Sequence, residues 1–303
     1  MQQTDPESST VSGYDVSLAV AGDQRALEYI GTSYAKSVVG SLRRSTMTVR
    51  KAIATTARRA LRLMGVRAVR KTAGGDRIYI PVEVGALRPL LFDRSYSGFF
   101  GEEEFFTAVS SRVCAEDTIF DIGAYIGVHS VLLSRIGRRV VAFEPNPAVF
   151  RVLLETTRAN NAVNVNTQQL AVAESSGAAY LAGIGSGASL SRSATTDSDL
   201  QVASVDLDTF AERHELWPDV MKIDVEGYEC EVFRGATRCL QTCRVVGLEL
   251  HLDLMTRHGG SADIIYSLMA EHGFRECARI ASRRHGTSDP TRVHVVFERT
   301  QPT

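Results

Sequence analysis

Two glycines closely following an acid mark the most informative stretch of the chain. In TIFDIGAYIGVHS, an apolar run leads to Asp121, and Gly123 and Gly127 follow with the spacing D-x-G-x-x-x-G. Glycines so placed let the chain turn tightly and let a ligand approach the backbone. A dinucleotide fingerprint would need G-x-G-x-x-G around a pyrophosphate. The Asp121 carboxylate would repel that group and favours a ligand with an amine or a sulfonium. The residues assigned to this ligand-binding turn are Asp121, Gly123, Ala124, Tyr125 and Gly127.

A second acid ends the next apolar stretch. The segment VVAFEP places Glu144 twenty-three residues after Asp121. An acid at the end of the second strand can accept both ribose hydroxyls of a nucleoside. The alternative is a helix N-terminal acid ahead of Pro145, but the neighbouring glycine turn favours the ligand. Together the two signals specify a nucleoside with a positively charged, phosphate-free tail, which describes S-adenosylmethionine.

The segment MKIDVEGYE carries charges at alternate positions. If it forms a strand, Lys222, Asp224 and Glu226 share one face, while Ile223 and Val225 take the other. A central parallel strand is normally apolar on both faces, and charges there are costly unless they are paired. One explanation is a Lys222–Asp224 ion pair that fixes the strand. We favour the other, in which Asp224 and Glu226 lie at the strand mouth beside the methyl donor.

The segment LELH repeats this alternation with Glu249 and His251. Methyl transfer to a hydroxyl requires an aligned acceptor oxygen, exclusion of water and removal of the proton. The predicted catalytic residues are His251, Glu226 and Asp224. His251 is the first choice for the base, with Glu249 orienting the imidazole; Glu226 is the alternative base, and a structural His251 stays open. The same side chains could hold a divalent cation, but no compact ligand motif is present and we expect no metal.

The elements that position these residues alternate along the chain. The predicted strands are RIYIPVEV (77–84), TIFDIG (118–123), RRVVAFEP (138–145), VNTQQLAVAE (165–174), DVMKIDVEG (219–227), CRVVGLELH (243–251) and RVHVVFER (292–299), with a short strand and helix in SVDLDTFAERH (204–214). The other predicted helices are 102–113, 128–136, 148–161, 228–241 and 262–274. Such alternation implies right-handed crossovers and a mainly parallel sheet covered on both faces. Ligands of such sheets bind beyond the carboxyl ends of the strands.

Four segments in this order and spacing resemble the FkbM family of S-adenosylmethionine-dependent methyltransferases: TIFDIGAYIGVHS, VVAFEPNPAVFRVLLETTRANN, DVMKIDVEGYECEVFRGA and VVGLELH. The resemblance covers about residues 100 to 298, and KIDVEGYE followed by FRGA is its most specific part. It implies a class I, Rossmann-like methyltransferase fold with a mainly parallel seven-stranded sheet and helices on both faces. It also implies methylation of a hydroxyl, often on a sugar or a secondary metabolite. The predicted partner is therefore a small-molecule or glycan acceptor.

Residues 1–75 lie outside this resemblance and are predicted to form an N-terminal extension ahead of a methyltransferase domain at 76–303. The first twenty residues are polar and predicted to be disordered. The pattern from Arg25 to Met64 is mainly helical, and between Glu28 and Asp76 the chain carries eleven basic residues and no acidic one. A basic helix is attracted to anionic surfaces. We favour a solvated helix, because no aromatic residue follows Tyr34 among the charges, and expect no specific nucleic acid.

Five cysteines without a C-x-x-C motif indicate buried free thiols in a reducing compartment. With no signal segment and no long apolar run, the chain is predicted to be cytoplasmic, and a homo-oligomer is compatible with the sequence. Two rival functions stay open. A nicotinamide-dependent oxidoreductase is disfavoured by Asp121 and by the missing third glycine. A non-catalytic module would use the basic helix to bind an anionic surface and keep a vestigial donor pocket.

Overall fold

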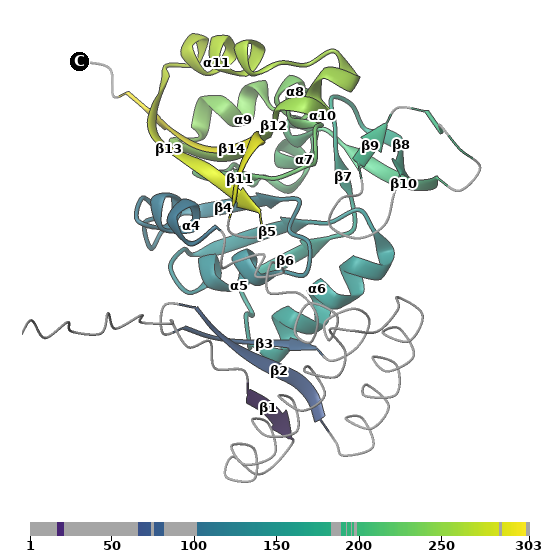
Figure 1. Ribbon diagram of the computed structural model, residues 1–303, viewed down its shortest axis with the longest axis vertical. Helices are drawn as coiled ribbons and strands as arrows, with labels where there is room; N and C mark the ends of the chain where they lie inside the picture. Colours follow the sequence, from purple (N-terminus) through teal and green to yellow (C-terminus); the bar gives the residue numbers. More distant parts are fainter. Residues whose placement is uncertain are drawn as a thin grey trace, which may run out of the picture.

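The structure is a computed structural model, and it describes residues 17–20, 66–73, 76–81, 102–182, 189–191, 193, 194, 196, 199–284 and 287–300. The helix predicted between Arg25 and Met64 falls outside these residues. From residue 102 onward, the predicted strands and helices follow in the expected order, but the strands Gly177–Ala182, Ser189–Ser191 and Phe274–Arg284 were not predicted (Figure 1).

The main sheet has seven strands in the order β13-β14-β12-β11-β4-β5-β6. These are β13 (Phe274–Arg284), β14 (Thr287–Arg299), β12 (Val245–His251), β11 (Val220–Ile223), β4 (Thr118–Ile122), β5 (Arg139–Phe143) and β6 (Val165–Gln168). The five strands from β12 to β6 pair in parallel, whereas β14 runs antiparallel to both β12 and β13. The chain order reverses between β4 and β11, which is where an open α/β sheet binds its ligand. The class I, mainly parallel seven-stranded architecture is confirmed.

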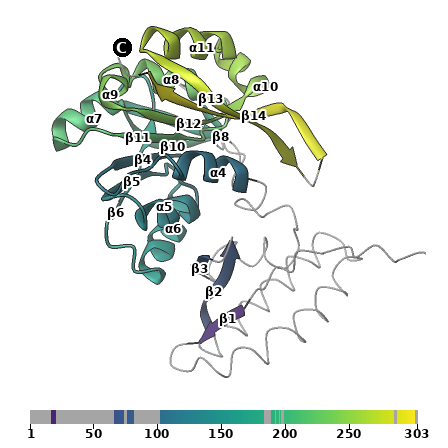
Figure 2. The same cartoon turned by 90° about the vertical axis from the view of Figure 1, so that its left-hand side faces the viewer.

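Helices cover both faces of this sheet, as Figures 1 and 2 show. One face carries α4 (Glu103–Ser110), α5 (Val128–Ser134) and α6 (Pro147–Ala159). The other carries α7 (Leu207–His214), α8 (Glu229–Arg234), α9 (Thr237–Thr242) and α11 (Ala262–Glu271). The short helices α10 (Leu252–Met255) and η2 (Thr256–His258) follow β12. The single helix predicted over 228–241 is therefore two helices, α8 and α9.

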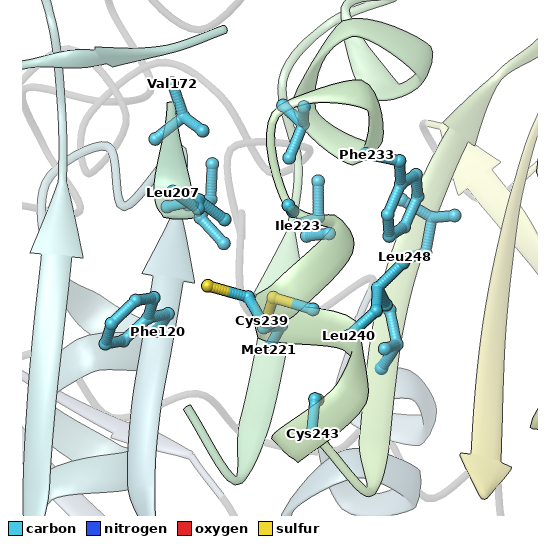
Figure 3. Close-up of a cluster of buried hydrophobic side chains, with 14 of the residues drawn as sticks. Phe120, Val172, Leu207, Met221, Ile223, Phe233, Cys239, Leu240, Cys243 and Leu248 are labelled. Atoms are coloured by element: carbon cyan, nitrogen blue, oxygen red, sulfur yellow. The ribbon is translucent and has the colours of Figure 1, made fainter. Parts of the chain in front are cut away.

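The larger core lies between the sheet and the second group of helices. Phe120 and Ile223 of the sheet pack with Leu207, Phe233 and Leu240 in a continuous buried cluster (Figure 3). Alternate residues of a strand point to opposite faces. Since this face takes the apolar residues of β4, β11 and β12, the polar residues between them must point to the face covered by α4 to α6.

A second sheet has four strands in the order β7-β10-β8-β9 and packs against the segment that follows β11. Its strands are β7 (Ala171–Val172), β10 (Leu200–Val205), β8 (Gly177–Ala182) and β9 (Ser189–Ser191). The single strand predicted over 165–174 is thus divided between two sheets, as β6 and β7. Val225 and Tyr228 pack against the apolar side of the second sheet, and the Ser189 hydroxyl donates to the Glu226 carbonyl at 3.0 Å. The second sheet therefore supports the loop that follows β11.

A third, antiparallel sheet joins β1 (Ser17–Val20), β2 (Val66–Ala73) and β3 (Asp76–Pro81). The predicted strand at 77–84 belongs to this sheet and not to the main one, and β1 forms within a stretch predicted to be disordered. Asn160, at the end of α6, accepts a hydrogen bond from the Tyr79 backbone N–H at 2.9 Å and donates to its carbonyl at 2.7 Å. Ile78 and Ile80 pack on Leu132. This sheet is thereby attached to the α5–α6 face.

All five cysteines are free thiols, as predicted, but the predicted burial is wrong for Cys114 and only partly right for Cys277. Cys230, Cys239 and Cys243 are buried, whereas Cys277 is half-buried and Cys114 is exposed. Among the residues that the structure describes, no helix combines the length and apolar character needed to cross a membrane.

Candidate active site

Charged and polar side chains form a row across four neighbouring strands, on the sheet face opposite the larger core. The strand register places them side by side, because each occupies the same position in the alternation of its own strand. Three cross-strand pairs make up the row: Lys222 with Asp121, Glu249 with His294, and His251 with Arg292. The shared face predicted for Glu249 and His251 is confirmed by this register.

The loop after β11 carries Asp224 and Glu226, and this differs from the expected strand over 219–227. β11 ends at Ile223, and Glu226 and Gly227 have left-handed backbones with φ of 50° and 98°. A Cβ on Gly227 would lie 2.5 Å from the Cβ of Leu254, so the turn requires glycine there. Left-handed conformations of non-glycine residues are strained and cluster at functional sites. Lys222, Asp224 and Glu226 therefore do not share a strand face.

The glycine turn after β4 is held by protein contacts. Gly123, Tyr125 and Gly127 have φ of 77°, 51° and 84°. A Cβ on Gly123 would lie 1.8 Å from the carbonyl oxygen of Asp224, and one on Gly127 would lie 2.5 Å from Cδ1 of Leu153. The tight turn predicted from the spacing is present. The space beside each α-carbon, however, is filled by the β11 loop and by α6, and not left open for a ligand.

A Gly123→Ala substitution is expected to destabilise the protein by about 2–4 kcal/mol, since it combines a left-handed alanine with overpacking against Asp224. Urea unfolding measures this loss. Gly259→Ala is the matched control: its φ is 72°, but its Cβ would meet nothing within 4 Å. It should cost only the backbone strain, about 1–2 kcal/mol. If both variants lose the same unfolding free energy, the close approach of the Asp224 carbonyl does not explain why residue 123 is glycine.

Asp121 points into the protein. Its side chain is 0% exposed, its Oδ2 accepts a hydrogen bond from the Ser130 hydroxyl at 2.5 Å, and its Oδ1 lies 3.4 Å from Lys222 Nζ. Lys222 also donates to the Gly123 carbonyl at 3.3 Å and lies 3.6 Å from Asp224 Oδ2, so the predicted Lys222–Asp224 pair is present. Direct contact between Asp121 and a cationic ligand, as the sequence suggested, does not fit this burial. The geometry makes Asp121 a positioning residue that fixes the turn through Lys222.

Burial and charge act in opposite directions on the Lys222 ammonium. Desolvation lowers its pKa, but Asp121 and Asp224 outweigh this and hold the pKa above its ordinary value. Lys222 is therefore a permanent positive charge beneath the glycine turn.

Glu144 lies where β5 ends, beside the glycine turn. Its carboxylate accepts hydrogen bonds from the backbone N–H groups of Tyr125 at 3.1 Å and Asn146 at 2.8 Å. Ala124 is buried next to it, and its N–H donates to the Phe143 carbonyl at 2.9 Å. Burial raises the pKa of Glu144 to about 8, against the opposing effect of the Asn146 N–H. The structure thus brings together the predicted ribose acid and the predicted turn.

His251 is enclosed by carboxylates at the end of β12. The side chain is 0% exposed, with Nδ1 2.7 Å from Glu229 Oε1 and Nε2 3.3 Å from Glu226 Oε2 and 3.8 Å from Glu249 Oε2. Burial lowers the pKa of His251, but the hydrogen bond that its ring donates to Glu229 and the charge of Glu249 outweigh this and raise the pKa to about 9. A buried imidazole in contact with carboxylates does not suit the role predicted for His251, removal of the proton from the acceptor hydroxyl. Glu229, and not Glu249, orients its ring.

The side chains of Asp224 and Glu226 are 25% and 13% exposed, more than those of Glu229 and Glu249, which are 0% and 6% exposed. Burial, followed by the charge of Glu249, raises the pKa of Asp224 to about 6, and burial raises that of Glu226 to about 7. Burial also favours the neutral form of Glu249, but His294 and His251 lower its pKa well below the ordinary range. Asp224 and Glu226 therefore hold a proton more readily than Glu249, which lies behind them.

Arg292 of β14 completes the cluster. Its guanidinium lies 3.1 Å from Glu226 Oε2 and 3.7 Å from Glu249 Oε1. His294 Nε2 lies 3.4 Å from Glu249 Oε1. The antiparallel strand β14 thus supplies basic groups to acids that belong to the parallel strands.

Residues 121–276 match the methyltransferase FkbM domain, which is about half of the chain. The chain belongs to the FkbM methyltransferase family. Over 153 residues it is 31% identical to the hexuronic acid methyltransferase AglP of Haloferax volcanii, a match that covers 50% of this chain and 63% of AglP. The chain thus spans less than two thirds of this curated relative. The family resemblance seen in the sequence is confirmed.

Two solved structures also align with this chain. Precorrin-6y C5,15-methyltransferase from Geobacter metallireducens aligns with a TM-score of 0.41 at 16% identity, covering 65% of this chain and 88% of its own. TYW2 from M. jannaschii, solved in complex with AdoMet, aligns with a TM-score of 0.41 at 14% identity, and the alignment covers 77% of this chain and 87% of TYW2.

Glu102 also belongs to the cluster, because it offers a carboxylate oxygen within 4.8 Å of ligand atoms of Glu249 and His294. The residues of the cluster that were not selected from the sequence are Glu102, Glu229, Arg292 and His294. Glu229 lies within KIDVEGYE, the most specific part of the FkbM pattern. The alternation of Arg292 and His294 in RVHVVFER is the same signal that identified LELH. Glu102 precedes α4, and no local pattern places it. Three of these four residues lie outside the 121–276 match.

Proposed function

We propose that this FkbM protein is an S-adenosylmethionine-dependent O-methyltransferase that acts on a hydroxyl of a sugar or secondary metabolite. The observation that carries the proposal is the junction beyond β4, β5, β11 and β12. There the glycine turn binds Glu144 through the Tyr125 N–H and packs against Asp224, and the carboxylates of Asp224 and Glu226 are partly exposed. Family membership favours this function over the nicotinamide-dependent oxidoreductase.

The residues present suit the donor. Glu144 has acceptor lone pairs for ribose hydroxyls beyond the two backbone N–H groups that it binds. Gly123, Ala124 and Tyr125 would contact the donor from the turn, and Asp224 would face its cationic end. When bound, S-adenosylmethionine supplies an electrophilic methyl carbon on a sulfonium.

In the proposed reaction, the mouth carboxylates align the acceptor hydroxyl and remove its proton. Glu226 is held between His251 and Arg292, at 3.3 and 3.1 Å, and receives the proton as the carbon–oxygen bond forms and the carbon–sulfur bond breaks. His251 supports Glu226 from behind, and Glu229 fixes the imidazole. Asp224 is the second carboxylate at the acceptor oxygen.

Because AglP is named as a hexuronic acid methyltransferase, hexuronic acids are the first acceptors to test. Calorimetric titration of the full chain with S-adenosylmethionine, its demethylated product and NAD⁺ tests the cofactor. Transfer of an isotopically labelled methyl group to hexuronic acids, neutral sugars and hydroxylated natural products then tests the acceptor. Binding of NAD⁺ in place of S-adenosylmethionine would overturn the proposal. Salt-sensitive binding to anionic lipid vesicles, with no transfer to any acceptor, would support the non-catalytic alternative.

The pH dependence of donor binding tests Glu144. A ribose hydroxyl donates to the ionised carboxylate, while burial raises the pKa of the free protein's Glu144 to about 8. Donor affinity measured by calorimetry is therefore expected to rise between pH 6 and about pH 8, by up to about tenfold per pH unit, and then to level off. Glu144→Gln, which cannot ionise, should bind more weakly and lose this dependence. An unchanged pH profile in the variant would remove Glu144 from the ribose contact.

Cytoplasmic location, self-association and attraction of the basic segment to an anionic surface stay predictions.

A further inference from the structure

We propose that Asp224, Glu249 and His251 bind one divalent metal ion at the mouth of the sheet. One potential ligand atom from each residue lies within 4.8 Å of the other two. The sequence offered no compact ligand motif, and no metal was expected. The fold assembles the set because His251 ends β12, Glu249 precedes it on the same face, and the β11 loop brings Asp224 alongside.

The Nε2 atom of His251 is the observation that points to a ligand. It is buried and makes no hydrogen bond with the residues that the structure describes, and it lies 3.3 Å from a carboxylate oxygen of Glu226 and 3.8 Å from one of Glu249. The opposite ring nitrogen, Nδ1, lies 2.7 Å from Glu229 Oε1. A metal-binding histidine characteristically donates its second ring N–H to a carboxylate, which fixes the tautomer and directs the free lone pair to the metal. The fully buried Glu229 is placed for this role.

The charges around the three residues also favour a cation. Lys222 is shared between Asp121 and Asp224, and Arg292 between Glu226 and Glu249. Buried carboxylates this close together repel one another unless a proton or a cation lies between them. One imidazole and two carboxylates form a mixed nitrogen and oxygen set, which suits Mn²⁺, Fe²⁺ or Zn²⁺ better than Ca²⁺.

A neighbouring group formed by Glu102, Glu249 and His294 has similar spacing and shares Glu249. His294 differs from His251 in its second nitrogen: Nδ1 has no hydrogen-bond partner among the described residues, and the ring stacks on Phe105 at 4.6 Å. Within the described part of the chain, no carboxylate accepts a hydrogen bond from this Nδ1 to fix the tautomer. The group that includes Asp224 is also closer to the surface, since the Asp224 side chain is 25% exposed.

Three protein ligands leave coordination positions open, as in catalytic metal sites. A role for the ion in holding an acceptor hydroxyl and lowering its pKa rests on the proposed function. Binding of the ion does not.

The test is titration of Mn²⁺ into the EDTA-treated full chain, followed by calorimetry and by the electron paramagnetic resonance of free Mn²⁺, with Mg²⁺ and Zn²⁺ as further probes. One Mn²⁺ per chain is expected. Asp224→Asn and His251→Gln should each weaken binding at least tenfold, and Glu229→Gln by about 10–100-fold. Asp253→Asn removes an exposed carboxylate two residues after His251 and is the matched control. That variant should bind within threefold of the wild type, whereas His294→Gln, which removes a neighbour of Glu249, should weaken binding less than His251→Gln does.

The inference is overturned if the wild type binds none of the three ions more tightly than Asp224→Asn does, or if His294→Gln abolishes binding while His251→Gln retains it. Circular dichroism of each variant checks folding. If His251→Gln unfolds, the comparison of Asp224→Asn with Asp253→Asn decides, because both positions are on the surface. Donor binding is measured on the same samples. Protein that binds S-adenosylmethionine but no metal overturns only this inference, whereas protein that binds metal but no donor overturns only the proposed function.

Discussion

Replacing Lys222 with methionine is expected to lower the free energy of unfolding by about 3–5 kcal/mol, because it leaves the fully buried Asp121 carboxylate without its cation. The Lys222 ammonium also holds the Gly123 carbonyl, so the glycine turn should loosen in the same variant. Urea unfolding monitored by circular dichroism measures the loss.

A double-variant cycle separates charge from packing. Adding Asp121→Asn to Lys222→Met removes the orphaned charge and should recover a large part of the lost stability. Arg238→Met is the surface comparison, since Arg238 pairs with Glu212 but is 45% exposed, and it should have no measurable effect. A Lys222→Met variant as stable as Arg238→Met would refute a structural role for the buried pair.

Glu226→Gln is expected to lower turnover by about 10²–10⁴-fold, the range for loss of a group that takes the acceptor proton. The amide keeps the size of the side chain but cannot accept that proton. Donor affinity, measured separately by calorimetry, should stay within threefold of the wild type. Turnover is measured by transfer of a labelled methyl group once an acceptor has been found.

Glu215→Gln is the control for this substitution. Glu215 has the same left-handed backbone as Glu226, with φ of 50°, and lies exposed after α7. Its replacement tests a change from glutamate to glutamine in that backbone without touching the site. If Glu226→Gln weakens donor binding and leaves turnover unchanged, Glu226 contacts the donor and is not the proton acceptor.

The sequence predicted the long, doubly buried strands of the site correctly. β12 is buried at every position, so the alternation in LELH placed Glu249 and His251 on one face without further information. The same reasoning failed after β11, where the alternation continues through Asp224 and Glu226 but the strand ends at Ile223. The loop that follows turns at Glu226 and Gly227, where the backbone packs closely against Leu254, and the alternation of residue types does not indicate that contact.

The direction of the Asp121 side chain was also beyond local reasoning. The spacing of its glycines predicted the turn, but the parallel register of β4 and β11 places Lys222 beside the carboxylate. Arg292 and His294 reach the cluster through the antiparallel pairing of β14 with β12. The paired residues of these two strands lie about forty positions apart in the chain. Such contacts depend on topology, which is why part of the cluster became visible only in the folded protein.

The antiparallel strand β14 limits how far the protein can be shortened. A fragment cut to the family match, residues 121–276, would lose β14 together with α4 and the beginning of β4. β12 would then become an open edge, and Glu249 would keep neither Arg292 nor His294 as a neighbour. The smallest fragment that retains the whole cluster of acidic and basic side chains at the active site therefore starts before Glu102 and extends to Arg299.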